Sequence, residues 1–131
     1  MGKQIVIIIL GLFAFTTSCK TGASDLNPNY PDEIINSWLE SYEEADGTYR
    51  PSDYKSFPES RYRQVYKFME KNTCEYSVLS PEDAHDIENG FWEYIEDENV
   101  INVYNQNMKL HEKLKVISIS ANLLQLDSVN P

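Results

Sequence analysis

The second half of the chain alternates between apolar and polar residues with a period of two, and aromatic and β-branched residues are frequent in it. Such alternation predicts strands that bury one face. The segments form three pairs, each joined by a short polar turn: 61–70 with 73–80, 91–96 with 100–106, and 113–120 with 123–129. Three hairpins in series predict an antiparallel β-meander.

The segment 31–44 fits two interpretations. Its apolar residues Ile34, Ile35, Trp38, Leu39 and Tyr42 are spaced as on an amphipathic helix, and a proline followed by an aspartate suits a helix start. The other interpretation is a short helical turn that leads into a strand. Periodicity alone leaves both open.

The N-terminus carries an apolar run, Ile5–Phe15, that is too short to cross a bilayer, which needs about 20 apolar residues. A lysine precedes the run, and the small residues T-T-S follow it, directly before Cys19. These features predict a cleaved secretion signal. A signal that ends in small residues before a cysteine resembles the lipobox of bacterial lipoproteins.

That resemblance implies that Cys19 becomes the first mature residue and is lipidated, with acyl chains such as palmitate. Two or more chains anchor a protein stably, because each buried CH₂ contributes about 0.8 kcal/mol. Lys20 is not the aspartate that retains such lipoproteins at the inner membrane, so the implied location is the outer membrane of the cell envelope. The alternative is an ordinary cleaved signal with an incidental cysteine.

The expected organisation is a signal peptide (1–18), a lipidated cysteine with a flexible tether (19–32) and one domain (33–131). Removing the signal, which carries one lysine and no acidic residue, changes the net charge from −10 to −11. An acidic chain of this kind does not suit nucleic-acid binding. The clusters of acidic residues are expected to be solvated turns.

The remaining cysteine, Cys74, lies in an alternating segment and is expected to be a small buried residue. With Cys19 lipidated, no intramolecular disulfide can form. His85 and His111 lack partners at metal-ligand spacing, so neither a metal nor a cofactor is expected.

Several strings resemble the lipocalin-like domains of small bacterial envelope lipoproteins. They are I-I-N-S-W-L-E-S-Y-E-E, the loop T-Y-R-P-S-D-Y-K-S-F-P-E-S-R-Y-R, the turn E-K-N-T-C-E-Y, N-G-F-W-E-Y-I-E-D-E-N-V-I, and the terminal L-K-V-I-S-I-S-A-N-L-L-Q-L-D. The resemblance covers about 33–129. It implies an all-β fold: an antiparallel meander that closes into a small lipocalin-like barrel of about eight strands. It also favours a helical turn near 31–36 and a strand near 38–45.

A barrel of eight strands is just wide enough to be filled by side chains or to hold one small ligand. Eight large aromatics are candidates to point inward, among them Tyr42 and Tyr104. Their first interpretation is a hydrophobic core, and the second is an apolar wall that receives a ligand. The candidate ligand-binding residues are Trp38, Tyr66, Phe68, Tyr76, Trp92 and Tyr94.

Three arginines lie near the entry to one predicted strand: Arg50, Arg61 and Arg63. A guanidinium suits a carboxylate or phosphate ligand. The arginines could instead pair with nearby glutamates and tie the long loop 46–60 to the first strand.

No motif of a nucleophile, a zinc protease, a P-loop or a dinucleotide fold is present in the sequence. We therefore expect a protein that is not an enzyme: a lipid-anchored binding domain for a small apolar ligand or an envelope partner. The alternative is a structural envelope component with a filled barrel, which contacts partners through its outer face.

Overall fold

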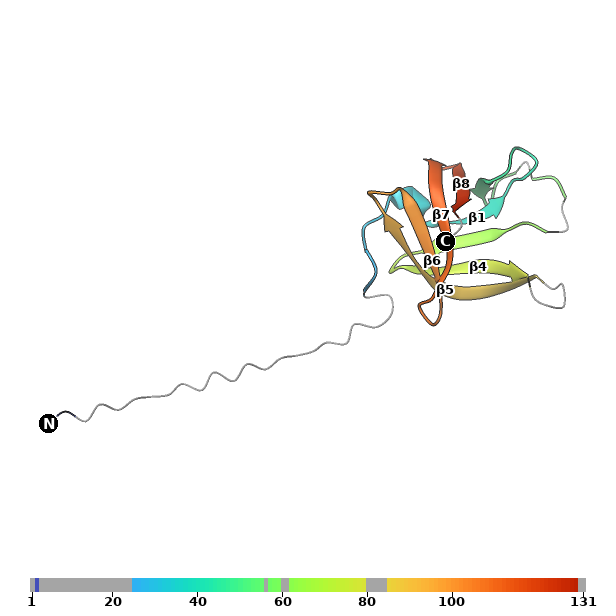
Figure 1. The fold of residues 1–131 in the computed structure, drawn as a ribbon. Helices are drawn as coiled ribbons and strands as arrows, with labels where there is room; N and C mark the ends of the chain where they lie inside the picture. The colour runs from blue at the N-terminus through green and yellow to red at the C-terminus, as the bar shows by residue number, and fades with distance from the viewer. Residues whose placement is uncertain (1, 3–24, 56, 60–61, 80–84, 130–131) are drawn as a thin grey trace.

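The chain folds into a closed antiparallel β-barrel (Figure 1). The structure is a computed structural model, and it describes residues 2, 25–55, 57–59, 62–79 and 85–129. A short 3-10 turn, η2 (Asp32–Ile34), precedes eight strands. The strands are β1 (Asn36–Glu40), β2 (Thr48–Pro51), β3 (Val65–Met69), β4 (Thr73–Leu79), β5 (His85–Ile95), β6 (Val100–Asn105), β7 (Leu110–Ile119) and β8 (Leu124–Val129). The predicted all-β fold and strand number are confirmed.

The three predicted hairpins are present as β3–β4, β5–β6 and β7–β8. In the first, Phe68 pairs with Cys74, and the turn places Lys71 and Asn72 at positive φ. Positive φ at two successive turn residues is typical of a type I′ turn, whose twist matches the flanking strands. Asparagine tolerates this conformation better than most residues, so the turn forms without glycine.

The segment 31–44 is not an amphipathic helix. Its helical part is the single turn η2, and β1 then ends at Glu40, whereas a strand was expected near 38–45. Strand pairing decides between the two interpretations, because Trp38 lies opposite Pro51 on one side and Tyr66 on the other. After Glu40 the chain turns sharply into β2, which returns along β1 and was expected to be loop.

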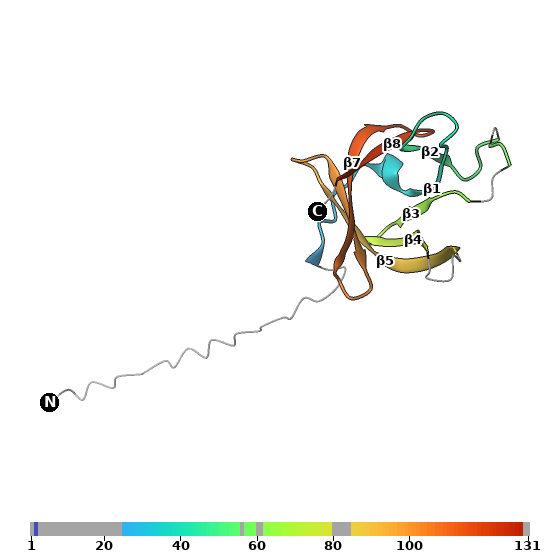
Figure 2. The ribbon, with the colours of Figure 1, turned by 45° about the vertical axis from the view of Figure 1, so that its right-hand side comes forward.

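Closure of the barrel depends on the short strand β2. It pairs with β1 on one side and with β8 on the other, where Thr48 lies opposite Gln125. Since β1 also pairs with β3, the strand order β1-β2-β8-β7-β6-β5-β4-β3 has no free end (Figure 2). Gly47, at positive φ, lets the chain pass close to β8: a Cβ there would lie 2.1 Å from the Leu126 carbonyl oxygen.

Two strands are longer than the alternation indicated. β5 begins at His85 instead of residue 91, and β7 begins at Leu110 instead of residue 113. The early part of β5 reads H-D-I-E-N, and the exposed polar residues Asp86, Glu88 and Asn89 hide the strand pattern. Residues His85 to Phe91 pair with β4 through the backbone, and this pairing forms the early part of β5.

The barrel interior is a continuous hydrophobic core. Both indoles are fully buried, and the Phe68 ring packs against Trp92 and Tyr66, with ring centroids 5.1 Å and 5.8 Å away. Burying one such side chain stabilises the fold by roughly 1.5–3 kcal/mol. The largest fully buried side chains are Trp38, Trp92, Tyr76, Phe68, Ile34, Ile101, Leu124, Val103 and Cys74.

Two of the aromatics expected to point inward do not. Tyr42 follows the end of β1 and is 42% exposed. Tyr104 follows the buried Val103 on β6, and successive side chains of a strand point to opposite faces, so Tyr104 lies on the outside of the barrel. The strand boundary and the side-chain parity of β6 account for these two errors.

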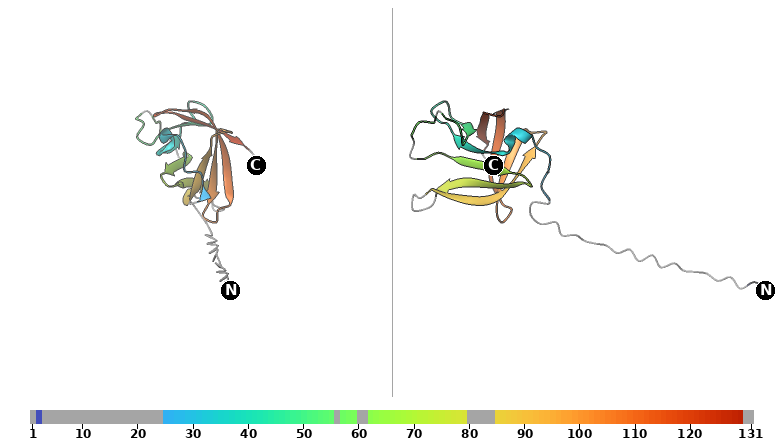
Figure 3. Two further views of the ribbon diagram at one scale, coloured as in Figure 1. Left: turned by 90° about the vertical axis from the view of Figure 1, so that its left-hand side faces the viewer. Right: turned by 180° about the vertical axis from the view of Figure 1, so that it is seen from behind.

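The two ends of the barrel carry different segments. The loops on either side of β2 and the start of β3 lie at one end, and the β3–β4 turn lies at the other (Figure 3). The described N-terminal residues run along the barrel at the second end and approach the β6–β7 turn (Figures 1 and 2). No helix within the described residues is long and apolar enough to span a bilayer.

Candidate functional site

Most of the predicted ligand-binding aromatics pack against one another in the core. Trp38 and Trp92 are 0% exposed, and Tyr66 and Phe68 are 3% and 1% exposed. The indole of Trp38 donates to the Ile34 carbonyl oxygen at 3.0 Å, and that of Trp92 donates to the Met69 carbonyl oxygen at 3.0 Å. Both indole N–H groups are therefore satisfied within the fold.

Carboxylates meet the core tyrosines at the edge of the barrel interior. The Tyr66 hydroxyl donates to Glu112, and the Tyr76 hydroxyl donates to Glu88 at 3.4 Å. The His111 ring stacks on the Tyr76 ring with centroids 4.4 Å apart. Burial, followed by the nearby Glu88, raises the pKa of Tyr76 to about 12. These hydroxyls are thus protonated donors at neutral pH.

Tyr94 differs from the other five aromatic candidates because it is only partly buried and lines a surface pocket. This pocket has a volume of about 310 Å³ and also involves Asn29, Tyr30, Pro31 and Glu96. The Tyr94 hydroxyl donates to the side-chain oxygen of Asn99 in the β5–β6 turn. Tyr94 packs against the core cluster from its edge, whereas the other five candidates are buried within the cluster.

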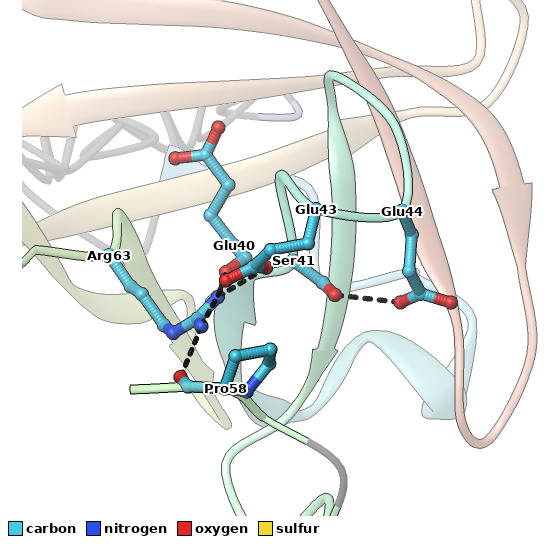
Figure 4. A network of polar contacts seen from close by, with 6 residues as sticks. All are labelled: Glu40, Ser41, Glu43, Glu44, Pro58 and Arg63. Carbon is cyan, nitrogen blue, oxygen red and sulfur yellow. Dashed lines mark hydrogen bonds and ion pairs between the residues drawn. The ribbon is translucent and has the colours of Figure 1, made fainter. Parts of the chain in front are cut away.

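Arg63 holds three segments together at the loop end of the barrel (Figure 4). Its guanidinium donates to the Glu43 carboxylate, to the Glu40 carbonyl oxygen at 2.8 Å and to the Pro58 carbonyl oxygen at 2.7 Å. It also lies over two aromatic rings, 4.7 Å from the Phe57 centroid and 5.1 Å from the Tyr42 centroid. Its donors are engaged by the protein's own groups, as expected of a residue that ties the loop.

Arg50 has a similar role on the other side of this loop. It contacts both carboxylate oxygens of Glu44, at 2.9 and 2.7 Å, and donates to the Asn122 carbonyl oxygen at 3.1 Å. It lies over the Tyr54 ring at 5.1 Å, and that ring packs edge-on against Phe57. The third predicted arginine, Arg61, lies outside the described residues.

We call the five residues Tyr42, Arg50, Tyr54, Phe57 and Arg63 the loop platform. Tyrosine and arginine are enriched among the residues that carry most of the binding energy in protein interfaces. Loops held by a rigid scaffold are also where binding residues concentrate. The sequence indicated the arginines but not Tyr54 and Phe57; the signal was a pair of aromatics three residues apart inside a polar loop.

Arginine hydrogen bonds lower the pKa values of two glutamates in this region, Glu43 and Glu44. The hydrogen bond from Arg50, with help from the Ser41 hydroxyl at 2.7 Å, lowers the pKa of Glu44 to about 2. The hydrogen bond from Arg63 lowers the pKa of Glu43. Both carboxylates are ionised at neutral pH, which keeps the ion pairs formed.

The remaining predicted chemistry concerns cysteines and metals. Burial raises the pKa of Cys74 to about 12, so its thiol is neutral, and the side chain is 1% exposed. The expectation of a small buried residue is confirmed. In the part of the chain that the structure describes, no three His, Cys, Asp or Glu side chains lie where they could hold a metal ion. Cys19 lies outside the described residues.

The end of the predicted tether, 19–32, is attached to the barrel. Asn27 donates from its backbone to Glu93 at 3.1 Å and from its side chain to the Tyr94 carbonyl oxygen at 2.8 Å. The side chain of Asn72 donates back to the Asn27 carbonyl oxygen at 2.7 Å. The Tyr30 ring packs on Trp92 with centroids 4.8 Å apart. No local pattern indicates these contacts, because the partners are far apart in the chain.

Comparison with known proteins returned no match: no family model, no curated protein and no solved structure matches this chain.

Proposed function

We propose that this chain is a lipid-anchored lipoprotein of the bacterial cell envelope, at the outer membrane, whose non-enzymatic barrel binds an envelope partner through the loop platform. The lipid would be carried by Cys19. The observation that supports a partner over an enclosed ligand is the packing of Trp38, Phe68 and Trp92: all three are at most 1% exposed, and the Phe68 ring contacts those of Trp92 and Tyr66.

A ligand site for an apolar molecule normally offers a preformed concave surface. Here the aromatic rings at the centre of the barrel fill the space between themselves, and both indole donors are bonded to backbone oxygens. Admitting a ligand between them would break these contacts. An enclosed apolar ligand is therefore the less supported form of the binding hypothesis.

The loop platform has the properties of a preorganised contact surface. Arg50 and Arg63 fix the loop through ion pairs and carbonyl contacts, so that Tyr54 and Phe57 are held in place before a partner arrives. Binding through an ordered surface avoids much of the entropy cost of fixing side chains.

The anchor is tested in cells of a bacterium that processes lipoproteins. The Cys19→Ala variant should lose incorporation of a labelled fatty acid and should no longer pellet with membranes. Cys74→Ala, which removes the other cysteine, should keep both properties. Unchanged labelling and pelleting of Cys19→Ala would exclude the anchor.

The binding site is tested by a photo-crosslinking residue placed at Tyr54 and, as the control, at Ile117, which is 53% exposed on β7. Tyr54 should give a discrete adduct in cells that Ile117 does not give. Equal adducts, or none at either position, would overturn the platform as a binding surface and favour a structural component. A change in Trp38 or Trp92 fluorescence with an apolar ligand would favour the enclosed-ligand alternative.

A further inference from the structure

The N-terminal residues fix the point from which the chain leaves the barrel. Glu93 accepts from the Asn27 backbone with one carboxylate oxygen and from the Tyr104 hydroxyl with the other, at 3.1 and 2.6 Å. Tyr104 of β6 lies opposite Phe91 of β5 on one side and opposite Leu110 of β7 on the other. The chain therefore leaves next to the outer face formed by these three strands.

This outer face is apolar beside the exit point. Leu110 is 45% exposed. Phe91 and Met69, with Thr73, Gly90 and Gln106, line a groove of about 470 Å³. Asn72, which binds the Asn27 carbonyl oxygen, belongs to the same β3–β4 turn as Met69, so the groove adjoins the attached segment.

Two lysines stand at the border of the apolar area. Lys71 lies in the β3–β4 turn and Lys109 in the β6–β7 turn, and both are exposed. We call Met69, Lys71, Phe91, Lys109 and Leu110 the anchor-side face. Aromatic and aliphatic side chains bordered by lysines are typical of surfaces that lie in the membrane interface.

The length of the intervening chain brings this face to the bilayer. Asp25, the first residue of the continuous segment that the structure describes, lies six positions after Cys19. Even a fully extended chain of six residues spans at most about 20 Å. A barrel anchored through Cys19 is thus held close to the membrane on the side where the segment leaves it.

We propose that the anchor-side face lies on the phospholipid bilayer, with Phe91 and Leu110 at the interface and Lys71 and Lys109 at the headgroups. This inference rests on the proposed lipid anchor. The loop platform lies at the opposite end of the barrel, at the start of β3, while Met69 ends that strand. Contact with the bilayer would therefore leave the platform directed away from the membrane.

Charge indicates which force would hold this face on the bilayer. Without the signal peptide the protein would carry a net charge of −11, and Glu70 precedes Lys71 directly in the chain. Attraction to anionic lipids would be weak, so apolar contact must dominate. Vesicles of zwitterionic phosphatidylcholine are the appropriate probe.

The test uses the full-length lipidated protein reconstituted into phosphatidylcholine vesicles that contain nitroxide-labelled lipid. A fluorophore is attached to Lys109→Cys at the anchor-side face and, in a matched protein, to Asn122→Cys in the exposed β7–β8 turn. Cys74 is 1% exposed and will not react in the folded protein. Quenching should be about twofold or more stronger at 109, because interfacial side chains reach about 5–10 Å into the bilayer.

Equal quenching at 109 and 122 in vesicles that carry the protein would overturn the inference while leaving the anchor intact. Failure of the protein to float with the vesicles would instead contradict the lipid anchor of the proposed function. Labels at Leu110→Cys and Ile117→Cys, two exposed positions of β7, give a second pair with the same expected order.

Discussion

The two ends of the barrel are held by different kinds of contact. At the loop end, Arg50 and Arg63 form ion pairs with Glu44 and Glu43, and the glutamate side chains are 38% and 29% exposed. At the N-terminal end, one amide hydrogen bond joins Asn72 to Asn27 and another joins Asn27 to Tyr94, and Asn72 is 4% exposed. Exposed ion pairs contribute little and are screened by salt, whereas buried hydrogen bonds are costly to break.

The difference fits two separate tasks. Ion pairs between side chains are enough to preorganise the loop platform, which we propose to be a contact surface, although salt and low pH weaken them. The N-terminal segment, which under the proposed function links the barrel to a lipid anchor, is held by amide hydrogen bonds, which depend less on salt and pH. The hydrophobic core lies between the two ends, and the loss of stability on truncating a core residue is the reference for the smaller effects expected at the ends.

The largest effect is expected in the core itself. Trp92→Ala removes a fully buried side chain that packs on Phe68 and Tyr30. It should lower the free energy of unfolding by about 3–5 kcal/mol, measured by urea denaturation. Ile117→Ala, on the exposed outer face, should change it by no more than about 0.5 kcal/mol. Similar losses for both would contradict the core position of Trp92.

The N-terminal end should respond next. The Asn72 side chain donates to the carbonyl oxygens of Asn27 and Trp92, at 2.7 and 3.0 Å, from a residue at positive φ. Asn72→Ala should therefore cost about 1–3 kcal/mol. Hydrogen exchange of the Asn27 amide should become faster in this variant. Asn122→Ala, in an exposed turn, should alter neither quantity. An unchanged exchange rate of the Asn27 amide in Asn72→Ala would show that the Asn72 side chain does not hold the N-terminal segment on the barrel.

The loop end should respond less. Arg63→Lys keeps the charge but loses the planar fork that contacts Glu43, Glu40 and Pro58. The expected cost is about 1 kcal/mol. Thermal melts should show that part of the cost disappears at high salt, because the screening length falls to about 3 Å at 1 M. A loss as large as that of Asn72→Ala, and independent of salt, would remove the contrast between the two ends.

The smallest effect concerns pH. The pKa of Glu44 is lowered to about 2 in the fold from an ordinary value of 4.5. A lowered folded-state pKa means that the stabilisation is complete above pH 4.5 and is lost as the pH falls towards 2. After allowance for solvent screening it amounts to about 0.2–1 kcal/mol. The stability difference between the wild type and Glu44→Gln should therefore shrink over this pH window and stay constant above it.

Alternation along the chain predicted the three hairpins because each strand of a half-buried sheet has apolar and polar residues in alternation. It did not predict β2, a strand of four residues that ends in a proline and exists only because β1 and β8 pair with it. The early part of β5 was missed for a related reason: it is a strand because its backbone pairs with β4, and its side chains do not alternate between apolar and polar.

The candidate site could be predicted only in part. Arginines near a strand entry and glutamates in the preceding turn indicated a loop-tying role for Arg50 and Arg63, and the contacts of both residues agree with it. The aromatics were correctly expected inside the barrel at Trp38, Tyr66, Phe68, Tyr76 and Trp92. Whether inward rings fill a barrel or line a cavity depends on their mutual packing in three dimensions, which a strand pattern does not contain.

The central claim is that the barrel interior is a packed core and that binding takes place on its surface. Acrylamide quenching of the two tryptophans tests it directly, in the presence and absence of an apolar probe. We predict that the folded protein is quenched several-fold less than the urea-unfolded chain, because Trp38 and Trp92 are 0% exposed, and that the probe changes nothing. Ready quenching in the folded state, or a change when the probe is added, would show an accessible cavity and contradict the account.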